Sequence, residues 1–204
     1  MQRTLTTLIV AAATLAPAAR AAADNYVVDA SHTSIIFGIS HLGYSYTYGR
    51  FNKLSGSFVI DAANPAASNF QLTIDAASVD TNDAKRDEHL RGPDFFNVNQ
   101  FPTVSFQSTA IEVTQGEGGP VYNVTGNFTM HGKTQQITLP LKKLGEGNGP
   151  YGNYRTGFFC DFRLKRSDYG MTTMVPNIGD TVAITISFEG IRQGQPQGSG
   201  SANR

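Results

Sequence analysis

Cysteine and tryptophan are scarce in this chain of 204 residues: Cys160 is the single cysteine and there is no tryptophan. One cysteine cannot form an internal disulfide, so the stability of the fold has to come from a packed core. Cys160 lies between Phe158 and Phe162 in an alternating apolar segment. This position predicts a small buried side chain and not an activated thiol.

Net charge is also lacking, because 16 basic residues balance 16 acidic ones and no basic run occurs. Nucleic-acid-binding surfaces usually gather Lys and Arg on one face, where they displace the counterions of the phosphate backbone. We therefore predict no nucleic-acid partner.

Long apolar runs are restricted to the beginning of the chain. The run Leu5 to Leu15 follows a basic residue and precedes small residues, which is the pattern of a secretory signal peptide spanning Met1 to Ala23. No later run reaches the roughly 18 apolar residues of a membrane span. We predict a periplasmic or secreted protein with one domain at 24–192 and a flexible polar tail at 193–204, without a membrane-spanning segment.

Period-2 alternation of apolar and polar residues dominates the predicted domain and indicates strands with one buried face. A further long strand is expected from Tyr46 to Asp61, bent near Gly56, because glycine inside a strand often marks a bulge or a barrel corner. Turn residues separate the runs, including a glycine-rich loop at 145–152. The other expected strands have inward-facing residues Ile35, Phe37 and Ile39; Phe70, Leu72, Ile74 and Ala76; Val104 and Phe106; Tyr122, Val124, Phe128 and Met130; Ile137, Leu139 and Leu141; Phe158, Cys160, Phe162 and Leu164; and Val182, Ile184, Ile186 and Phe188.

One segment, Asp83 to Arg91, has the pattern of a short helix, with capping residues before it and a Gly-Pro stop after it. About eight antiparallel strands with one apolar face can close into a barrel or stack as a sandwich. The many large apolar residues on the inward face favour a barrel whose interior is filled or holds one small ligand. We therefore predict an all-β fold, an antiparallel barrel of about eight strands with one short helix in a connection.

Several sequence blocks, in this order, resemble the signature segments of the YceI-like proteins. The resemblance spans roughly Tyr26 to Ile191, and only the glycine-rich loop and the tail depart from the family pattern. It implies a lipocalin-like barrel with an internal pocket for a polyisoprenoid or another amphiphilic lipid, usually in a bacterial periplasm. The blocks are Asp29-Ala-Ser-His-Thr-Ser-Ile-Ile-Phe37, His41, Gly49-Arg-Phe51, Gly56-Ser-Phe58, Arg86-Asp-Glu-His-Leu-Arg91, Asp94-Phe-Phe96, Phe101-Pro-Thr-Val-Ser-Phe106 and Gly126-Asn-Phe-Thr-Met-His-Gly132.

Given that resemblance, the expected ligand is a long-chain lipid of the polyisoprenoid or isoprenoid quinone type, and no other cofactor is expected. A buried tail gains roughly 0.8 kcal/mol per methylene, so a long chain can be held without strong polar contacts. The alternative is that the inward residues simply fill the core. The predicted tunnel residues are Ile35, Phe37, Phe58, Leu72, Ile74, Phe106, Phe128, Leu139, Phe158, Phe162, Ile184 and Ile186.

Basic side chains in the helical segment and in a later turn are candidates for holding a phosphate or carboxylate head group. The alternative is that Arg86, Asp87 and Glu88 form a structural network of ion pairs that holds the helix as a lid. The head-group candidates are Arg86, His89, Arg91 and Lys165.

Other functions have weaker support in the sequence. No Gly-x-Ser-x-Gly motif marks a hydrolase nucleophile, although a peptidase or esterase stays an alternative. The four histidines His32, His41, His89 and His131 lack the spacing of a compact metal site, so we predict neither a metal nor a catalytic residue. His32 and His41 are expected to bond neighbouring groups. A stress-related interaction protein that binds a fatty-acid-type ligand is a further alternative, and a homodimer stays open.

Overall fold

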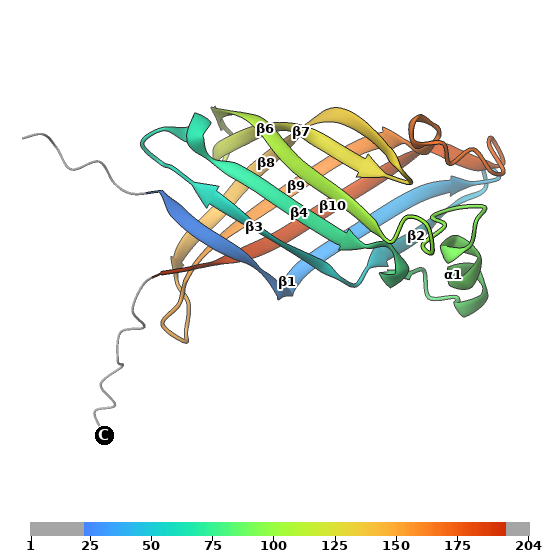
Figure 1. Cartoon of the computed structure of the whole chain (residues 1–204), viewed down its shortest axis with the longest axis horizontal. Coiled ribbons are helices and arrows are strands. Elements are labelled where there is room, and N and C mark those ends of the chain that lie inside the picture. The colour runs from blue at the N-terminus through green and yellow to red at the C-terminus, as the bar shows by residue number, and fades with distance from the viewer. Residues whose placement is uncertain (1–22, 195–204) are drawn as a thin grey trace, which may run out of the picture.

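A computed structural model describes residues 23–194 of the chain (Figure 1). The predicted signal segment, except Ala23, and the predicted tail, except Gln193 and Gly194, lie outside the described residues. The strands are β1 (Asp24–His41), β2 (Ser45–Phe51), β3 (Leu54–Ile60), β4 (Asn69–Asp75), β5 (Val79–Asp80), β6 (Thr103–Gly116), β7 (Gly119–Met130), β8 (Lys133–Asn148), β9 (Tyr154–Lys165) and β10 (Ile178–Arg192). The α-helix is α1 (Ala84–Arg91), and the short 3-10 helices are η1 (Pro65–Ala67), η2 (Ala76–Ser78) and η3 (Arg166–Tyr169).

The strands form a closed antiparallel barrel. Eight of them follow one another around the ring in the order β1, β3, β4, β6, β7, β8, β9 and β10. The ring is closed by β1 and β10, whose pairing runs from Tyr26 opposite Arg192 to His41 opposite Ile178. The predicted barrel of about eight strands with one short helix is therefore confirmed.

Two short strands, β2 and β5, extend this ring toward one end. β2 pairs with the second half of β1, whereas β3 pairs with its first half, so β2 and β3 occupy the same position in the ring. The prediction of one continuous strand from Tyr46 to Asp61 is wrong, because the chain leaves the ladder at Asn52 and Lys53. The backbone amides of these two residues bond to the carbonyl and hydroxyl oxygens of Ser78, both at 3.1 Å.

Gly56 allows β3 to approach its neighbour closely and does not mark the interruption. Its φ of 151° is one that L-residues with side chains rarely adopt. A Cβ atom at this position would also lie 2.2 Å from the carbonyl oxygen of Gln71 in β4. Glycine is therefore needed here for the β3–β4 pairing.

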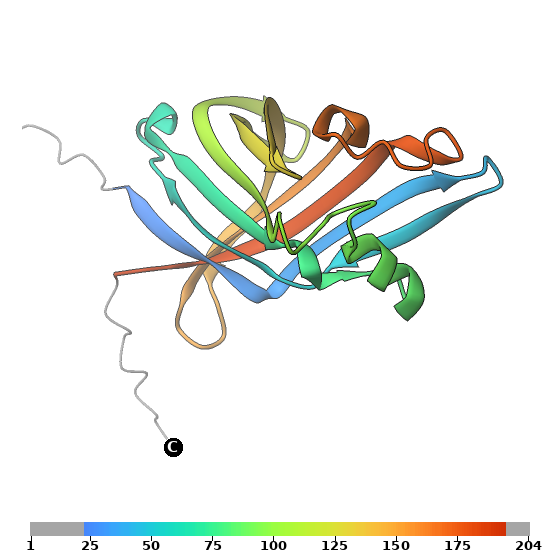
Figure 2. The same cartoon turned by 45° about the vertical axis from the view of Figure 1, so that its right-hand side comes forward.

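Half of the glycine-rich segment at 145–152 is strand. Gly145 to Asn148 continue β8 and pair with Gly157 to Tyr154 of β9. The predicted loop is therefore wrong over these four residues, and only the turn at 149–153 connects the two strands. The resulting hairpin extends beyond the barrel at the end where the described chain begins and ends (Figures 1 and 2).

α1 covers the other end of the barrel, as the cartoons show (Figures 1 and 2). Its start is set by Asp83, whose carboxylate accepts hydrogen bonds from the amides of Lys85 and Arg86. Gly92 follows its last residue, as the Gly-Pro stop predicted. The helix observed at Ala84–Arg91 thus confirms the predicted element.

The predicted ion-pair network on this helix is wrong, because Arg86 and Asp87 contact Thr81 instead. The Arg86 guanidinium donates to the Thr81 hydroxyl and to its carbonyl, both at 2.7 Å. The buried Asp87 carboxylate accepts from the Thr81 amide at 2.8 Å and from its hydroxyl. Within residues 23–194, no ion pair joins Arg86, Asp87 and Glu88 to one another. Thr81 therefore contributes to the attachment of the helix and serves both side chains.

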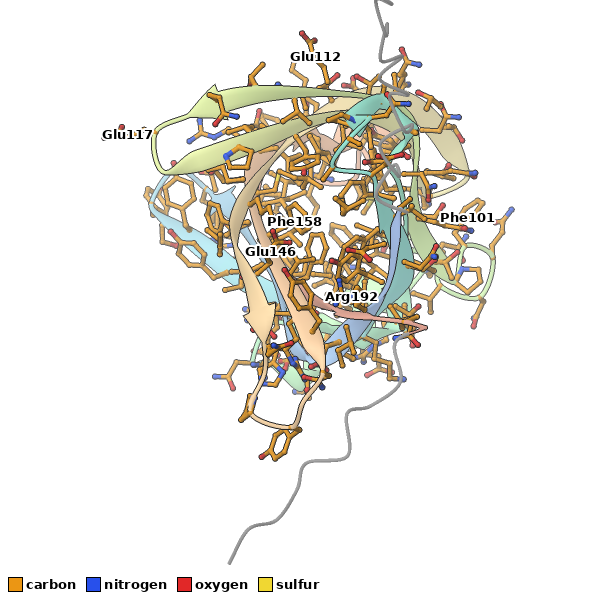
Figure 3. All side chains as sticks on the ribbon, turned by 90° about the vertical axis from the view of Figure 1, so that its left-hand side faces the viewer. Phe101, Glu112, Glu117, Glu146, Phe158 and Arg192 are labelled. Carbon is orange, nitrogen blue, oxygen red and sulfur yellow. The ribbon has the colours of Figure 1, made fainter. Side chains whose placement is uncertain are left out.

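The interior near the termini is filled with aromatic rings. Phe58 stacks on Tyr26 with ring centroids 4.9 Å apart and on Phe70 at 5.2 Å. Phe158 stacks on Phe188 at 5.6 Å, and the end-on view shows Phe158 inside the ring of strands (Figure 3). Such contacts add to the area that the rings bury. We call this group the aromatic plug; its members come from six strands and are Tyr26, Phe58, Phe70, Tyr122, Phe158 and Phe188.

Candidate functional site

The interior at the α1 end is hollow. A cavity of about 670 Å³ lies between the inner faces of the strands, α1 and the segment after β9. This volume is within the range of about 300–1,000 Å³ that is usual for small-molecule sites. A second void of about 30 Å³ shares part of its wall with the first.

Apolar side chains form most of the cavity wall. Seven of the twelve predicted tunnel residues line the large cavity, namely Ile35, Phe37, Ile74, Phe128, Phe162, Ile184 and Ile186. Leu72, Phe106 and Leu139 line only the smaller void. The wall is completed by apolar residues that the prediction missed, among them Ile39, Leu90, Val104, Met130, Met171 and Ile178.

The two remaining predicted tunnel residues, Phe58 and Phe158, line neither space. Both belong to the aromatic plug and are at most 1% exposed. Their assignment to a tunnel wall is therefore wrong: the alternation placed them correctly on the inward face, but at the filled end. The plug closes the interior behind the cavity.

Two of the four predicted head-group residues line the cavity, Arg86 and His89. The His89 imidazole also pairs with the exposed Asp94 carboxylate at 2.9 Å. Arg91 and Lys165 do not reach the cavity. Arg91 instead donates to the backbone carbonyls of Ala77 and Val79, at 2.9 and 3.0 Å, which fixes the last turn of α1 to the sheet. Lys165 is exposed to solvent.

Arg166 is a cavity residue that the sequence reasoning missed. Its guanidinium is almost completely buried and donates to three backbone carbonyls, those of Gly179 at 2.9 Å, Met171 at 2.8 Å and Ile178 at 3.0 Å. Burial disfavours the charged form and lowers the pKa of Arg166. The signal was present in the sequence, since the inward alternation Phe158, Phe162, Leu164 leads directly to position 166.

The charged residues of the wall all have the same sign. Lys85, Arg86 and Arg166 line the cavity together with His41 and His89, whereas no Asp or Glu of the described chain does so. Ser45, Thr47 and Thr81 contribute hydroxyl groups. A mainly apolar space with a few hydrogen-bond donors suits a guest with a long apolar part and one electron-rich polar group.

A cluster with the composition of a metal site lies outside the cavity. Asp29, His32 and Glu189 place their ligand atoms within 4.8 Å of one another. The Arg155 guanidinium lies among them, with its Nη1 atom 2.6 Å from the Asp29 carboxylate and 2.8 Å from that of Glu189. Arginine thus supplies the cation at this cluster. His32 bonds to Asp29 at 2.7 Å, which confirms its predicted neighbouring contact.

The cysteine is placed as the sequence predicted. Cys160 has no exposed surface, and burial raises the pKa of its thiol to about 12. The thiolate is therefore not formed at neutral pH, so this side chain is part of the core and not a nucleophile.

These features define the protein as a lipocalin-like antiparallel barrel with a one-ended apolar cavity. The YceI-like domain family matches residues 26–190, and the chain therefore belongs to this family. Among the described residues, no helix has the length and apolar character needed to cross a membrane.

Curated relatives match nearly the whole chain. The UPF0312 protein of Pseudomonas paraeruginosa is 43% identical over 195 residues, which cover 95% of this chain and 100% of that protein. A UPF0312 protein of Pectobacterium atrosepticum is 40% identical and is covered to 99%.

Solved structures share the fold. BcnA of Burkholderia cenocepacia has a TM-score of 0.70 and 28% identity, over 79% of this chain and 98% of BcnA. A domain from Saccharophagus degradans, described as polyisoprenoid binding, has a TM-score of 0.63 and 20% identity, over 82% of this chain and 98% of that domain.

Proposed function

We propose that this protein is a periplasmic carrier that holds one long-chain amphiphilic lipid, of the polyisoprenoid or isoprenoid quinone type, inside the barrel. The observation that carries the proposal is the cavity of about 670 Å³, which is apolar along its wall and basic where α1 and Arg166 border it. The lipid tail would occupy the apolar part, where each buried methylene contributes roughly 0.8 kcal/mol.

The polar end of the guest would lie near Arg86, His89 and Arg166. Arg86 and Arg166 already bond to protein oxygens, which holds their guanidinium groups in place. Placement of positive charge beside the cavity favours carbonyl, carboxylate or phosphate oxygens over a cationic group. The polyisoprenoid binding ascribed to the Saccharophagus degradans domain agrees with this proposal. The predicted signal peptide supports the periplasmic location.

The hydrolase alternative has less support from the site. Ser45, His41 and His89 line the cavity and Asp94 pairs with His89 at 2.9 Å, but among the described residues no hydrogen bond joins either histidine to the Ser45 hydroxyl. The alternative of a stress-related interaction protein that binds a fatty-acid-type ligand would use the same cavity, and the mass of the bound lipid distinguishes it from the carrier proposal.

Native mass spectrometry after detergent-free purification tests the carrier proposal. We expect the wild-type protein to carry one lipid of defined mass, and Ile184→Trp, whose larger ring narrows the cavity, to lack it. Ala183→Trp is the matched control, because its side chain is exposed on the next position of the same strand. The proposal fails if the wild type is empty after incubation with such lipids, or if Ile184→Trp carries as much as Ala183→Trp. The same spectra report whether the protein is a monomer or a homodimer.

A further inference from the structure

Two chain segments at the open end of the cavity contain no Asp, Glu, Lys or Arg. They are His41–Gly49, which forms the β1–β2 hairpin, and Gly170–Asn177, which connects η3 to β10; we call them together the mouth rim. Asp, Glu, Lys and Arg make up 16% of the whole chain, so their absence from these 17 positions, 15 of them exposed or half-exposed, is a distinctive feature of this surface.

The mouth rim instead exposes large apolar and aromatic side chains. Tyr44 is 89% exposed and Tyr46 66% exposed, and the rim supplies six of the ten exposed large hydrophobic residues among those described. Groups of exposed apolar residues commonly mark an interaction site, whereas single ones do not. The six are Leu42, Tyr44, Tyr46, Tyr48, Met174 and Val175.

The two segments form one continuous surface around the cavity. The amide of Leu42 donates to the carbonyl of Asn177 at 2.7 Å, so the hairpin and the connection touch. Both lie at the end of the molecule opposite the described termini (Figures 1 and 2). Along the hairpin, Ser45 and Thr47 line the cavity while their neighbours Tyr44, Tyr46 and Tyr48 are exposed. Met174 takes part in both the exposed surface and the cavity wall.

We infer that the mouth rim docks on the surface of a lipid bilayer, with the cavity opening toward the lipid. The inference rests on the proposed function, since a guest that is insoluble in water has to leave and enter the cavity through a membrane. Tyrosine suits this role, because its ring enters the interfacial region while its hydroxyl remains at the head-group level. An uncharged rim avoids the cost of removing charges from water on docking.

The rim and its surroundings indicate docking that depends little on lipid charge. Lys85 and Arg86 lie at the cavity beside the rim, but Asp83, Asp87 and Glu88 are on the same helical segment. Basic clusters that bind anionic membranes contain a clear excess of Lys and Arg. We therefore expect similar binding to uncharged and anionic bilayers.

Vesicle sedimentation with the purified full-length mature protein tests the inference. The probes are vesicles of phosphatidylcholine alone and vesicles that also contain phosphatidylglycerol. The test variant is Tyr44→Thr with Tyr46→Thr: Tyr44 lies in the turn before β2, and the β-branched threonine at position 46 suits a strand. Tyr48 is left unchanged because it lies over Gly38, within 2.9 Å of the place of a Cβ atom there. Tyr151→Thr is the matched control: this residue is 85% exposed in the β8–β9 hairpin at the other end.

We expect the wild type and Tyr151→Thr to sediment equally with both kinds of vesicle. The double variant should bind on the order of tenfold more weakly, because loss of about 60 Å² of buried apolar surface already corresponds to such a factor. The inference is overturned if the wild type does not bind vesicles or if the double variant binds as well as the wild type. It is also overturned if the double variant only converts a dimer to a monomer, which would make the rim an interface between two copies.

Failure of this inference and failure of the carrier proposal can be told apart. The double variant should still take up lipid that is delivered from detergent, because its substitutions lie outside the cavity wall. Ile184→Trp should still dock on vesicles although it carries no lipid. If the wild type docks on vesicles but carries no lipid, the docking inference stands and the carrier proposal is refuted.

Discussion

The two ends of the barrel are built from the same strands, yet one is solid and the other hollow. At the terminal end, aromatic rings from six strands meet at centroid distances of 4.9 to 5.8 Å and leave no cavity. At the α1 end, aliphatic residues, six phenylalanines, Met171 and Arg166 surround a space of about 670 Å³. Inward orientation therefore does not by itself decide between core and binding site. The two ends differ in whether the side chains pack against one another across the interior.

Phe158 and Phe162 allow this comparison within one strand, and the largest effect is expected at Phe158. Phe158→Ala should reduce the free energy of unfolding by about 3–5 kcal/mol, because a fully buried ring would leave a void among its aromatic neighbours. Denaturant unfolding measures this loss. Lipid binding below the unfolding transition should be unchanged, because Phe158 does not line the cavity.

Phe162→Ala should cost less stability, about 1–2 kcal/mol, since part of its ring faces the cavity and only the rest is packed. It should, however, weaken lipid binding, which native mass spectrometry detects. Equal stability losses for the two variants would show that the interior is filled to the same degree at both ends, and the comparison would be broken.

Arg166 stabilises the wall of the hollow end, whereas packed aromatic rings stabilise the solid end. Arg166→Met should reduce the free energy of unfolding by about 2–3 kcal/mol, because three buried carbonyls lose their donor. Thermal unfolding of this variant beside Arg166→Lys, which keeps one donor group and the charge, measures the effect. A smaller loss of unfolding free energy than for Phe162→Ala would mean that water bonds to the three carbonyls in place of the guanidinium. The hydrogen bonds of Arg166 would then not be needed for the fold.

Asp29 marks the bend of β1 between the two ends and makes stability there depend on pH. Hydrogen bonds from Ser31, His32 and Arg155 hold the pKa of Asp29 well below its usual value of 3.8. A carboxyl group whose pKa is lower in the folded protein than in the unfolded chain stabilises the fold. This contribution is complete above about pH 3.8 and is lost as the pH falls toward the lowered pKa. Asp29→Asn should therefore flatten the dependence of the melting temperature on pH below about 4. The same slope in both proteins would exclude this carboxylate as its source.

The smallest effect is expected at Cys160, in the wall between the two ends. Because burial raises the pKa of its thiol to about 12, the native protein should not react with maleimide at neutral pH. Reaction should appear on unfolding in guanidinium chloride, with mass spectrometry as the readout. Rapid labelling of the native protein would show that this part of the barrel opens to solvent.

The sequence contained enough information for the barrel, the helix and the inward face, because these follow from local periodicity and capping. The sequence does not show at which end of the barrel, filled or hollow, each inward residue lies. Phe58, Phe158 and Phe162 look alike in an alternating strand, and only the pairing of distant strands decides which ring meets other rings. The sequence also does not reveal the interruption at Asn52 and Lys53, because it depends on hydrogen bonds to Ser78 from another part of the chain. Arg166 could have been found by extending the alternation of β9 by one step.

Closure of the ring by β1 and β10 has a consequence for biogenesis. The first and last strands of the domain share hydrogen bonds over most of their length, so the sheet keeps two open edges until the final strand has been synthesised. Contacts between such distant parts of a chain form slowly. Folding of a newly made chain is therefore delayed by its own connectivity, which is compatible with the periplasmic location proposed above.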